Sequence, residues 1–436
     1  MSDLKIENIA IGEIHPYAKN AKNHPEKQIQ QIAESIKHYG FNNPLILDEN
    51  NEVIAGHGRL DAAKVIGLDT VPVIRLSHLT EVQKRAYRLA DNKIASNGGW
   101  NEGLLRLEIS ELETICDDLD ISITGFDDIE IDVLMNPEQK DADPKVNNVP
   151  YISESEIVSK VGDIWNIGEH RIICGNALDD LVFEKLMQGK LADLIESDPP
   201  WNIPARAIGG NGKIKHADFK MAAGEMSESE FTQFLIDNFK LCSKYSTKRA
   251  LCYHWIDFRH ISEIMSAGKQ AYDSLINLCV WTKHNAGLGS FYRSQHELCF
   301  VFCNGKESHV NNVELGRHGR YRSNVWSYPG VGGFGKNKND LKYHPTVKNF
   351  SMIKDLILDA SSRGDLVLDT FLGSGTTLIA AHQAKRICYG IELEPLYIDT
   401  AIRRFKELFG IDAIRESDGK TYTELLAEKL SNQEVA

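Results

Sequence analysis

The sequence predicts a small α+β region followed by a larger α/β domain. The α/β prediction rests on residues 366–391, where an apolar run, a glycine turn, a helical stretch and a second apolar run follow one another. The α+β prediction rests on residues 6–94, where helical patterns and short apolar runs follow one another. With 436 residues, the chain is long enough for two or three domains.

In the first region, an amphipathic pattern predicts a helix that Gly40 ends. Short strands are expected at Leu45–Leu47 and at Val53–Ile54, on either side of a polar turn. A further strand is expected over 71–76. The apolar face of the first helix consists of Ile29, Ile32, Ala33 and Ile36. The segment Gly56-His57-Gly58-Arg59 opens a second helix. Thr80-Glu81-Val82-Gln83 is the capping box of a third helix.

In the second region, Leu366–Leu368 is predicted to be a buried strand, and Asp369–Phe371 its carboxyl end. The turn Gly373–Gly375 leads into a helix over about 376–384, and the next strand ends in Glu392. This arrangement binds nucleotide-like ligands, and an acid at the second strand end accepts the two ribose hydroxyls. The full G-x-G-x-x-G fingerprint is absent, and no Gly-Lys-Ser/Thr follows, which excludes a phosphate loop.

The segment Asp198-Pro199-Pro200-Trp201 suggests chemistry on an amino group of a base. Such an amine is a poor nucleophile until acceptors bind its protons, and here Asp198 and the carbonyl of Pro199 supply acceptors. Proline stiffens the loop, and Trp201 offers a flat face to a base flipped out of a duplex. Taken alone, the segment also fits an ordinary turn. We predict these four residues, Asp198, Pro199, Pro200 and Trp201, to be catalytic.

From about Val161 to Phe409 the chain resembles the permuted, beta-type DNA amino-methyltransferases, in which the target-base motif precedes the cofactor motif. The resemblance implies a Rossmann-like domain with a seven-stranded, mainly parallel sheet, and S-adenosylmethionine as cofactor. Asp198, the first residue of the motif at 198–201, favours adenine as the target base, because cytosine-amino relatives commonly have Ser at this position. The matching blocks are 165–178, 198–201, 291–297, 343–348, 368–375 and 390–392.

By this resemblance, Thr346 and Lys348 lie near the methionine carboxylate, where a lysine suits an anion, and Glu392 holds the ribose. Asn176 stands where relatives often have Asp, and it bonds the adenine ring without charge. The full predicted cofactor set is Asn176, Asp198, Thr346, Lys348, Asp369, Phe371, Gly373, Ser374, Gly375, Thr376 and Glu392.

Residues 6–94 resemble the ParB-like module of chromosome-partition proteins. In that family the turn corresponding to Gly56, His57, Gly58 and Arg59 binds a nucleotide phosphate, as a helix amino terminus with an arginine can. Leu60-Asp61 replaces the richer arginine run of the family. Three roles therefore stay open for this region: a structural or DNA-positioning part, a nucleotide site, or a nuclease. His57 is also compatible with an ordinary turn histidine.

The formal net charge of −13 requires that a DNA-binding protein concentrate its positive charge locally. Two basic stretches do so, one after Trp201 and one between Gly305 and Asn349, and such runs are also typical of solvated loops. Arg293 lies between them. The predicted DNA contacts are Arg206, Lys213, Lys215, Arg293, Arg317, Arg320, Arg322, Lys336 and Lys338.

The composition of the chain predicts its domain boundaries and its cellular compartment. Acids alternate with apolar residues over 108–135, and 136–150 has linker composition. We expect no membrane span, no signal peptide and no metal site, and the eight scattered cysteines indicate reduced thiols in the cytoplasm. The predicted domains are a ParB-like domain at 1–100, an acidic helical connector and linker at 101–150, the methyltransferase at 151–412, and a terminal helix and tail at 413–436.

The predicted function is site-specific methyl transfer from S-adenosylmethionine to the amino group of a flipped adenine in DNA, with or without a restriction nuclease. The alternatives are a cytosine-amino DNA methyltransferase, an RNA or protein-glutamine methyltransferase, and a ParB-like protein that binds DNA or a nucleotide. DNA is the expected partner, and a homodimer stays open.

Overall fold

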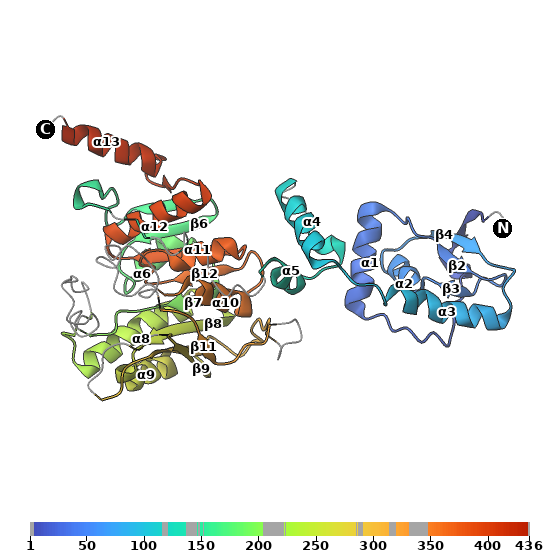
Figure 1. The fold of residues 1–436 in the computed structure, drawn as a ribbon, viewed down its shortest axis with the longest axis horizontal. Coiled ribbons are helices and arrows are strands. Elements are labelled where there is room, and N and C mark those ends of the chain that lie inside the picture. The colour runs from blue at the N-terminus through green and yellow to red at the C-terminus, as the bar shows by residue number, and fades with distance from the viewer. Residues whose placement is uncertain are drawn as a thin grey trace. The chain divides into compact units, whose positions relative to one another are not determined.

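The chain divides into two compact units, residues 1–135 and 136–436, both drawn in Figure 1. Each unit has its own sheet and its own hydrophobic core. None of the described helices is long and apolar enough to cross a membrane. The computed structural model describes residues 4–115, 121–136, 146, 149–150, 152–203, 222, 224–284, 286, 291–313, 320–330 and 348–434.

The first unit contains a four-stranded sheet in the order β1-β4-β2-β3. Strand β4 pairs antiparallel with β1 and parallel with β2, and β2 forms an antiparallel pair with β3. The inward side chains are apolar, including Leu45, Leu47, Val71 and Val73, which are fully buried. The bounds are β1 (Ile6–Ala10), β2 (Leu45–Leu47), β3 (Val53–Ala55) and β4 (Thr70–Arg75).

The helices of the first unit begin and end at the signals that the sequence carries. Helix α1 (Glu26–Tyr39) ends at Gly40, whose φ is 85°, and α2 (His57–Val65) begins after Gly56, whose φ is 102°. Helix α3 (Glu81–Ala95) starts with the predicted capping box between Thr80 and Gln83. These three helix predictions, and the three strand predictions, are confirmed.

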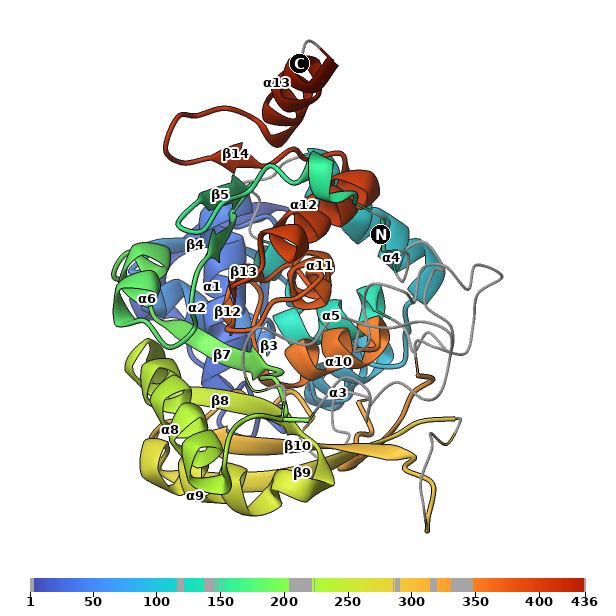
Figure 2. The same ribbon diagram turned by 90° about the vertical axis from the view of Figure 1, so that its left-hand side faces the viewer.

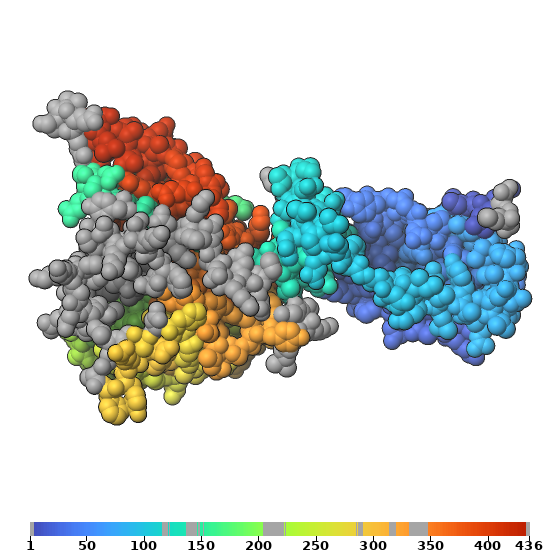
Figure 3. Space-filling view, in the orientation of Figure 1, coloured from blue at the N-terminus to red at the C-terminus, as the bar shows by residue number. Residues whose placement is uncertain are grey.

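The acidic segment after α3 forms α4 (Glu102–Ile115), a short 3-10 turn η2 (Ile121–Thr124) and α5 (Asp128–Met135). Arg106 Nε of α4 donates to the carbonyl of Leu134 in α5, at 2.8 Å. Leu104 and Leu107 of α4 are exposed, on a helix drawn in cyan in the space-filling view of Figure 3. The segment is therefore helical, as its composition predicts.

The second unit is built on a ten-stranded sheet in the order β11-β9-β10-β8-β7-β12-β13-β6-β5-β14. The seven strands from β9 to β6 in this order form the predicted mainly parallel sheet, with β10 antiparallel to both of its neighbours. The other three are short edge strands that no apolar run signals. The bounds are β5 (Ile164–Ile167), β6 (His170–Cys174), β7 (Ala192–Ser197), β8 (Ser246–Ile256), β9 (Ser274–Thr282), β10 (His296–Cys303), β11 (Val325–Ser327), β12 (Leu366–Asp369), β13 (Ile387–Glu392) and β14 (Ile414–Arg415).

Helices cover both faces of this sheet, so its central strands, such as β6, β7 and β12, are buried on both sides. Figure 2 shows α6, α8 and α9 on one face and α10, α11 and α12 on the other. Each face has its own apolar cluster, around Phe183 and Phe239 on the first and around Trp255 and Leu378 on the second. The bounds are α6 (Asp180–Met187), α8 (Glu228–Lys244), α9 (Ile261–Ala271), α10 (Phe350–Ala360), α11 (Thr376–Gln383), α12 (Pro395–Phe409) and α13 (Tyr422–Glu434), with short 3-10 turns η3 (Glu154–Glu156) and η4 (Phe258–His260).

Candidate active site

The two predicted motifs lie side by side at the carboxyl ends of adjacent parallel strands. Strands β7 and β12 pair in parallel, with Glu196 opposite Asp369. One residue further on, the hydroxyls of Ser197 and Thr370 are hydrogen-bonded at 2.9 Å. Asp198 and the glycine loop follow directly on the chain, so the base motif and the cofactor motif share one edge of the sheet.

Two more parallel strands extend this edge. Strand β13 pairs with β12 and with β6. Its last residue, Glu392, lies opposite Cys174, just before Asn176. The amide of Gly175 donates to the carbonyl of Glu392 at 2.9 Å. The predicted residues Asp198, Phe371, Glu392 and Asn176 therefore follow four consecutive strands at the position where α/β sheets bind ligands.

The carboxylate of Asp198 is held on one side and left without a partner on the other. Its Oδ2 lies 2.6 Å from Lys348 Nζ. Its Oδ1 is buried and has no hydrogen-bond partner among the described residues. Burial raises the pKa of Asp198, although Lys348 acts to lower it. A buried acceptor without a donor is costly, so this atom is suited to a donor from a ligand.

The structure brings Lys348 to the base motif. Its ammonium contacts Asp198 and, at 3.0 Å, Glu297 Oε2. It also lies over the rings of Trp201 and Trp255, at 4.8 and 5.2 Å from their centroids. The lysine that resemblance assigns to the methionine carboxylate is thus bonded to two carboxylates of this chain, and its predicted cofactor contact stays a prediction. Thr346 lies outside the described residues.

Trp201 is buried, and the residue after it fixes the loop. Asn202 adopts a left-handed conformation with φ of 49°. Its side-chain oxygen accepts from the amides of Gly224 and Met226, and its side-chain nitrogen donates to the carbonyl of Met226 at 2.8 Å. The loop that contains Pro199 and Pro200 is therefore tied to the segment leading into α8.

The glycine loop packs closely against α12. Gly375 has φ of 82°, and a Cβ there would lie 2.7 Å from Cβ of Ala401, so a larger residue does not fit. Arg404 of α12 donates to the carbonyl and the hydroxyl of Ser374 and lies 3.5 Å from the hydroxyl of Thr376. Ser374 and Thr376, which we predicted to bind the cofactor, therefore also anchor the loop to α12.

Glu392 is the acid at the end of β13. Its Oε2 accepts from the amide of Gly373 at 2.9 Å, and its Oε1 accepts from the amide of Glu394 at 2.8 Å. Burial nevertheless raises the pKa of Glu392 to about 7. Asn176 Oδ1 accepts from the amide of Leu178 at 3.0 Å, which orients its side chain. Both residues lie where a nucleoside ligand is expected.

One acid beneath the site, Glu196, was not predicted from the sequence, and it lies opposite the predicted Asp369. Glu196 and Asp369 are both buried. Burial and the charge of Asp198 raise the pKa of Glu196, and burial and the charge of Glu196 raise the pKa of Asp369. Glu196 Oε1 accepts from Trp255 Nε1 at 2.8 Å, and its Oε2 accepts from the hydroxyl of Thr377 at 2.9 Å. An acid inside an otherwise apolar strand was the available signal for Glu196.

The predicted DNA contacts are only partly described. Arg320 Nη2 and Arg322 Nε lie 2.7 and 2.9 Å from the carboxylate of Asp359 in α10. This placement gives both arginines a structural role, and their contact with DNA stays a prediction. Arg293 lies before β10. Outside the described residues lie Arg206, Lys213, Lys215, Arg317, Lys336 and Lys338.

In the first unit, the glycine turn is closely packed. Arg59 Nη1 donates to the carbonyls of Asn43 and Pro44 at 2.7 and 3.2 Å. His57 Nε2 accepts from the amide of Tyr17, and burial lowers the pKa of His57. A Cβ on Gly58 would meet the ring of His24 at 2.9 Å. The predicted nucleotide site at 56–59 stays a prediction.

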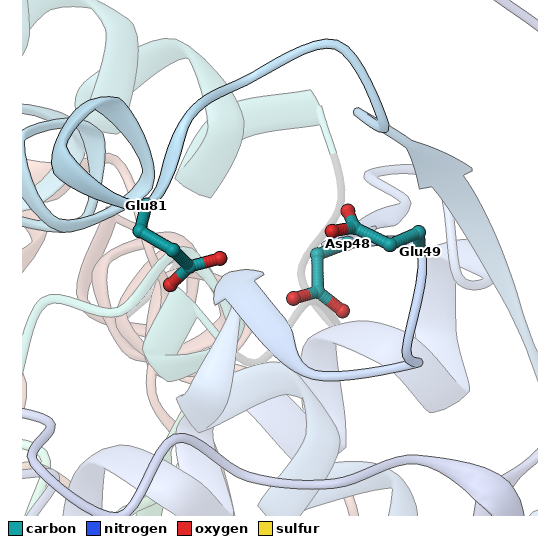
Figure 4. A group of neighbouring side chains, drawn as sticks. All are labelled: Asp48, Glu49 and Glu81. Carbon is teal, nitrogen blue, oxygen red and sulfur yellow. The ribbon is translucent and has the colours of Figure 1, made fainter.

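Three acids of the first unit gather at Asp48, Glu49 and Glu81 (Figure 4). The ammonium of Lys84 lies 3.1, 2.9 and 2.8 Å from their carboxylates. The lysine supplies the positive charge that this cluster needs, so we assign no metal ion to these acids.

Family models match three parts of the chain. A DNA methylase model covers residues 192–403, a ParB N-terminal domain model covers 1–93, and a ParB-methyltransferase HTH domain model covers 103–160. The chain therefore contains a DNA methylase domain with a ParB N-terminal domain ahead of it. The resemblances predicted from the motifs, and the prediction of a DNA methyltransferase, are confirmed.

Individual relatives match the two parts of this DNA methylase separately. The ParB-like nuclease domain-containing protein YnaK of Escherichia coli (strain K12) is 50% identical over 82 residues, which are 19% of this chain and 94% of YnaK. The type II methyltransferase M.HpaI of Haemophilus parainfluenzae is 27% identical over 57% of this chain and 78% of its own. The DNA adenine methyltransferase YhdJ of Escherichia coli (strain K12) is 26% identical over 53% of this chain and 81% of its own. Among solved structures, the M1.HpyAVI-SAM complex covers 54% of this chain and 98% of its own, at 21% identity and a TM-score of 0.40.

Proposed function

We propose that this DNA methylase transfers a methyl group from S-adenosylmethionine to the exocyclic amino group of an adenine flipped out of DNA. The observation that carries the proposal is Asp198, which follows β7 beside the glycine loop of β12 and whose buried Oδ1 has no hydrogen-bond partner in the described part of the chain. Relatives such as YhdJ are named DNA adenine methyltransferases, which supports adenine as the target.

The residues around the edge fit the cofactor by their chemistry. Glu392 is a partly buried acid at a strand end, suited to accept hydrogen bonds from ribose hydroxyls. At Gly373 the space that a Cβ would take is open, with the carbonyl of Phe371 nearest at 3.9 Å, so a ligand can approach the backbone there. When bound, S-adenosylmethionine supplies an electrophilic methyl group on its sulfonium sulfur.

Asp198 orients and activates the target amine. Its Oδ1 accepts one amino proton and the carbonyl of Pro199 accepts the other, which localises the nitrogen lone pair. A carboxylate is too weak a base to deprotonate an aromatic amine beforehand. The proton is therefore lost during or after the attack, and the raised pKa of Asp198 makes the carboxylate a better acceptor at that moment. Trp201 stacks on the flipped base.

The direct test is to incubate the full chain with cofactor labelled in the methyl group and with DNA, RNA or protein. DNA that takes up label is digested to nucleosides and analysed by mass spectrometry. Label on the amino group of deoxyadenosine supports the proposal. Label on the cytosine amino group, on RNA or on a glutamine contradicts it.

We further propose that the ParB domain and the helices up to residue 135 position the DNA, because the methylase match begins only at residue 192. A nucleotide site at Gly56–Arg59, a homodimer and a cytoplasmic location remain predictions. DNA affinity of the full chain with and without added nucleotide tests the first, analytical ultracentrifugation tests the second, and cell fractionation tests the third.

A further inference from the structure

A buried row of alternating charges runs from Asp198 along the carboxyl edge of the sheet. Lys348 Nζ lies 2.6 Å from Asp198 Oδ2 and 3.0 Å from Glu297 Oε2. The other oxygen of Glu297 lies 2.5 Å from Lys283 Nζ. Glu297 belongs to β10, and Lys283 follows the last residue of the paired strand β9. Pairing of the two strands therefore sets the second half of the row.

The middle of the row is buried and its two ends are more exposed. The side chains of Lys348 and Glu297 are 7% and 10% exposed, whereas those of Asp198 and Lys283 are 19% and 31% exposed. Buried ion pairs are often less stabilising than apolar side chains of similar size. A row of this kind beside the reacting carboxylate therefore indicates a role in the reaction as well as in the fold.

We propose that Glu297 and Lys283 are positioning residues for methyl transfer, which act through Lys348 to set how strongly Asp198 accepts a hydrogen bond from the target amine. This inference rests on the role proposed for Asp198. Lys348 fixes Oδ2 and leaves Oδ1 to the amine. Glu297 draws part of the lysine charge away from Asp198, and Lys283 limits that effect by neutralising Glu297.

The other charged or titratable groups near Asp198 come from the adjoining strands. Glu196 lies on β7, Asp369 on β12 and Cys299 on β10. Burial raises the pKa of Asp198, Lys348 lowers it and Glu297 raises it. The pH dependence of transfer can therefore report on the row, provided that only Glu297 or Lys283 is changed.

The test is the pH dependence of the single-turnover transfer rate in the full chain, measured for Glu297→Gln and Lys283→Met. The acid limb of this profile is the range in which the rate falls as pH falls. The first change removes a negative charge that disfavours ionised Asp198, so the limb should move to lower pH. The second leaves Glu297 without its outer partner, so the limb should move to higher pH. Each shift should change the rate on the limb, relative to its plateau, by about threefold or more.

The distinguishing result is that the acid limbs of the two variants shift in opposite directions. If Glu297 and Lys283 were merely structural, both substitutions would lower the plateau rate without moving the two limbs apart. Glu297→Asp and Lys283→Arg keep the charges, and their limbs should stay within about twofold of the parent rate profile. Lys244→Met removes an exposed ion pair with Asp180, and serves as the matched control with no shift.

Binding of S-adenosylhomocysteine shows which variants are folded. Shifts in the same direction, or no shift in either folded neutral variant, overturn the inference. If Glu297→Gln or Lys283→Met does not fold, the test passes to Glu297→Asp and Lys283→Arg. A shifted acid limb in these charge-keeping variants overturns the inference, and an unshifted limb supports it. The base that the parent enzyme methylates is identified in a separate experiment. A wrong prediction of adenine specificity is therefore distinguishable from a wrong assignment of Glu297 and Lys283 as positioning residues.

Discussion

Each unit contains a buried lysine surrounded by acids, and the two clusters differ in how fully their carboxylates are paired. Around Lys84, three carboxylates each bond the same ammonium, and two of them, Glu49 and Glu81, reach solvent. Around Lys348, Asp198 bonds the ammonium through one oxygen and leaves the other buried without a partner among the described residues. A satisfied cluster stabilises a fold, whereas an unsatisfied buried acceptor marks a place for chemistry.

The sharpest way to break this comparison is Asp198→Ala. We expect a loss of transfer of about a thousandfold or more, because the amine loses its charged acceptor. Cofactor binding should stay near the parent value, since Glu392 and the glycine loop are unchanged. Single-turnover kinetics and calorimetric titration with S-adenosylhomocysteine measure the two effects. Near-normal turnover would refute the role of Asp198.

Trp201→Ala addresses the grip on the base. Stacking on an aromatic ring contributes about 1–3 kcal/mol per base, so affinity for DNA with a flipped target should fall by roughly tenfold or more. Fluorescence of 2-aminopurine at the target position measures flipping, and gel shifts measure affinity. An unchanged affinity would count against stacking.

Lys84→Met addresses the cluster that we consider purely structural. Removal of the shared ammonium should destabilise the first unit by about 2 kcal/mol, and it should leave methyl transfer intact. Urea unfolding of the full chain measures the first effect. In the parent, burial acts to raise the pKa of Asp48, but the amide of Glu52 and Lys84 lower it overall. This stabilisation is present above the normal Asp pKa and is lost as pH falls through the lowered value. A loss of activity without a loss of stability would show that the two clusters do not differ as argued.

Glu392→Gln tests a third acid, which is partly buried and combines amide partners with a raised pKa. Its pKa of about 7 means that the ionised acceptor is lost as pH falls through neutrality. We expect the cofactor KM of the parent to rise below pH 7, and the variant to bind about tenfold more weakly at pH 8 with little further dependence on pH. A parent KM that does not vary between pH 6 and 8 would contradict this assignment.

Ser197→Ala should have the smallest effect. It removes the hydroxyl bond to Thr370 that links the two motifs, at a cost of about 1 kcal/mol. The expected result is a fewfold lower kcat with a nearly unchanged KM for DNA. Thr370→Ser, which keeps the hydroxyl, is the matched control. A fall in both variants to the same extent would show that the bond is not what matters.

Local patterns in the sequence were sufficient for many elements. The end of α1 at Gly40, the start of α2 after Gly56 and the capping box of α3 were all predicted correctly, because each depends on a few neighbouring residues. The strand, glycine turn and helix over 366–383 were predicted for the same reason. The edge strands β11 and β14 were not predicted, because they pair with strands far away in the chain. The short strand β5, which pairs with its neighbour β6, was not predicted either.

The sequence by itself determined the parts of the site: a proline loop beginning with an acid, a glycine turn, and an acid at a strand end. Only the tertiary structure decided that Lys348 bonds Asp198 and that Glu297 and Lys283 continue the row. The physical reason is that burial and Coulomb interactions depend on distance in space. The residues concerned lie up to 150 positions apart in the chain. They meet because β7 and β9 end, and the antiparallel β10 begins, at the same edge of the sheet, where the segment before α10 adds Lys348.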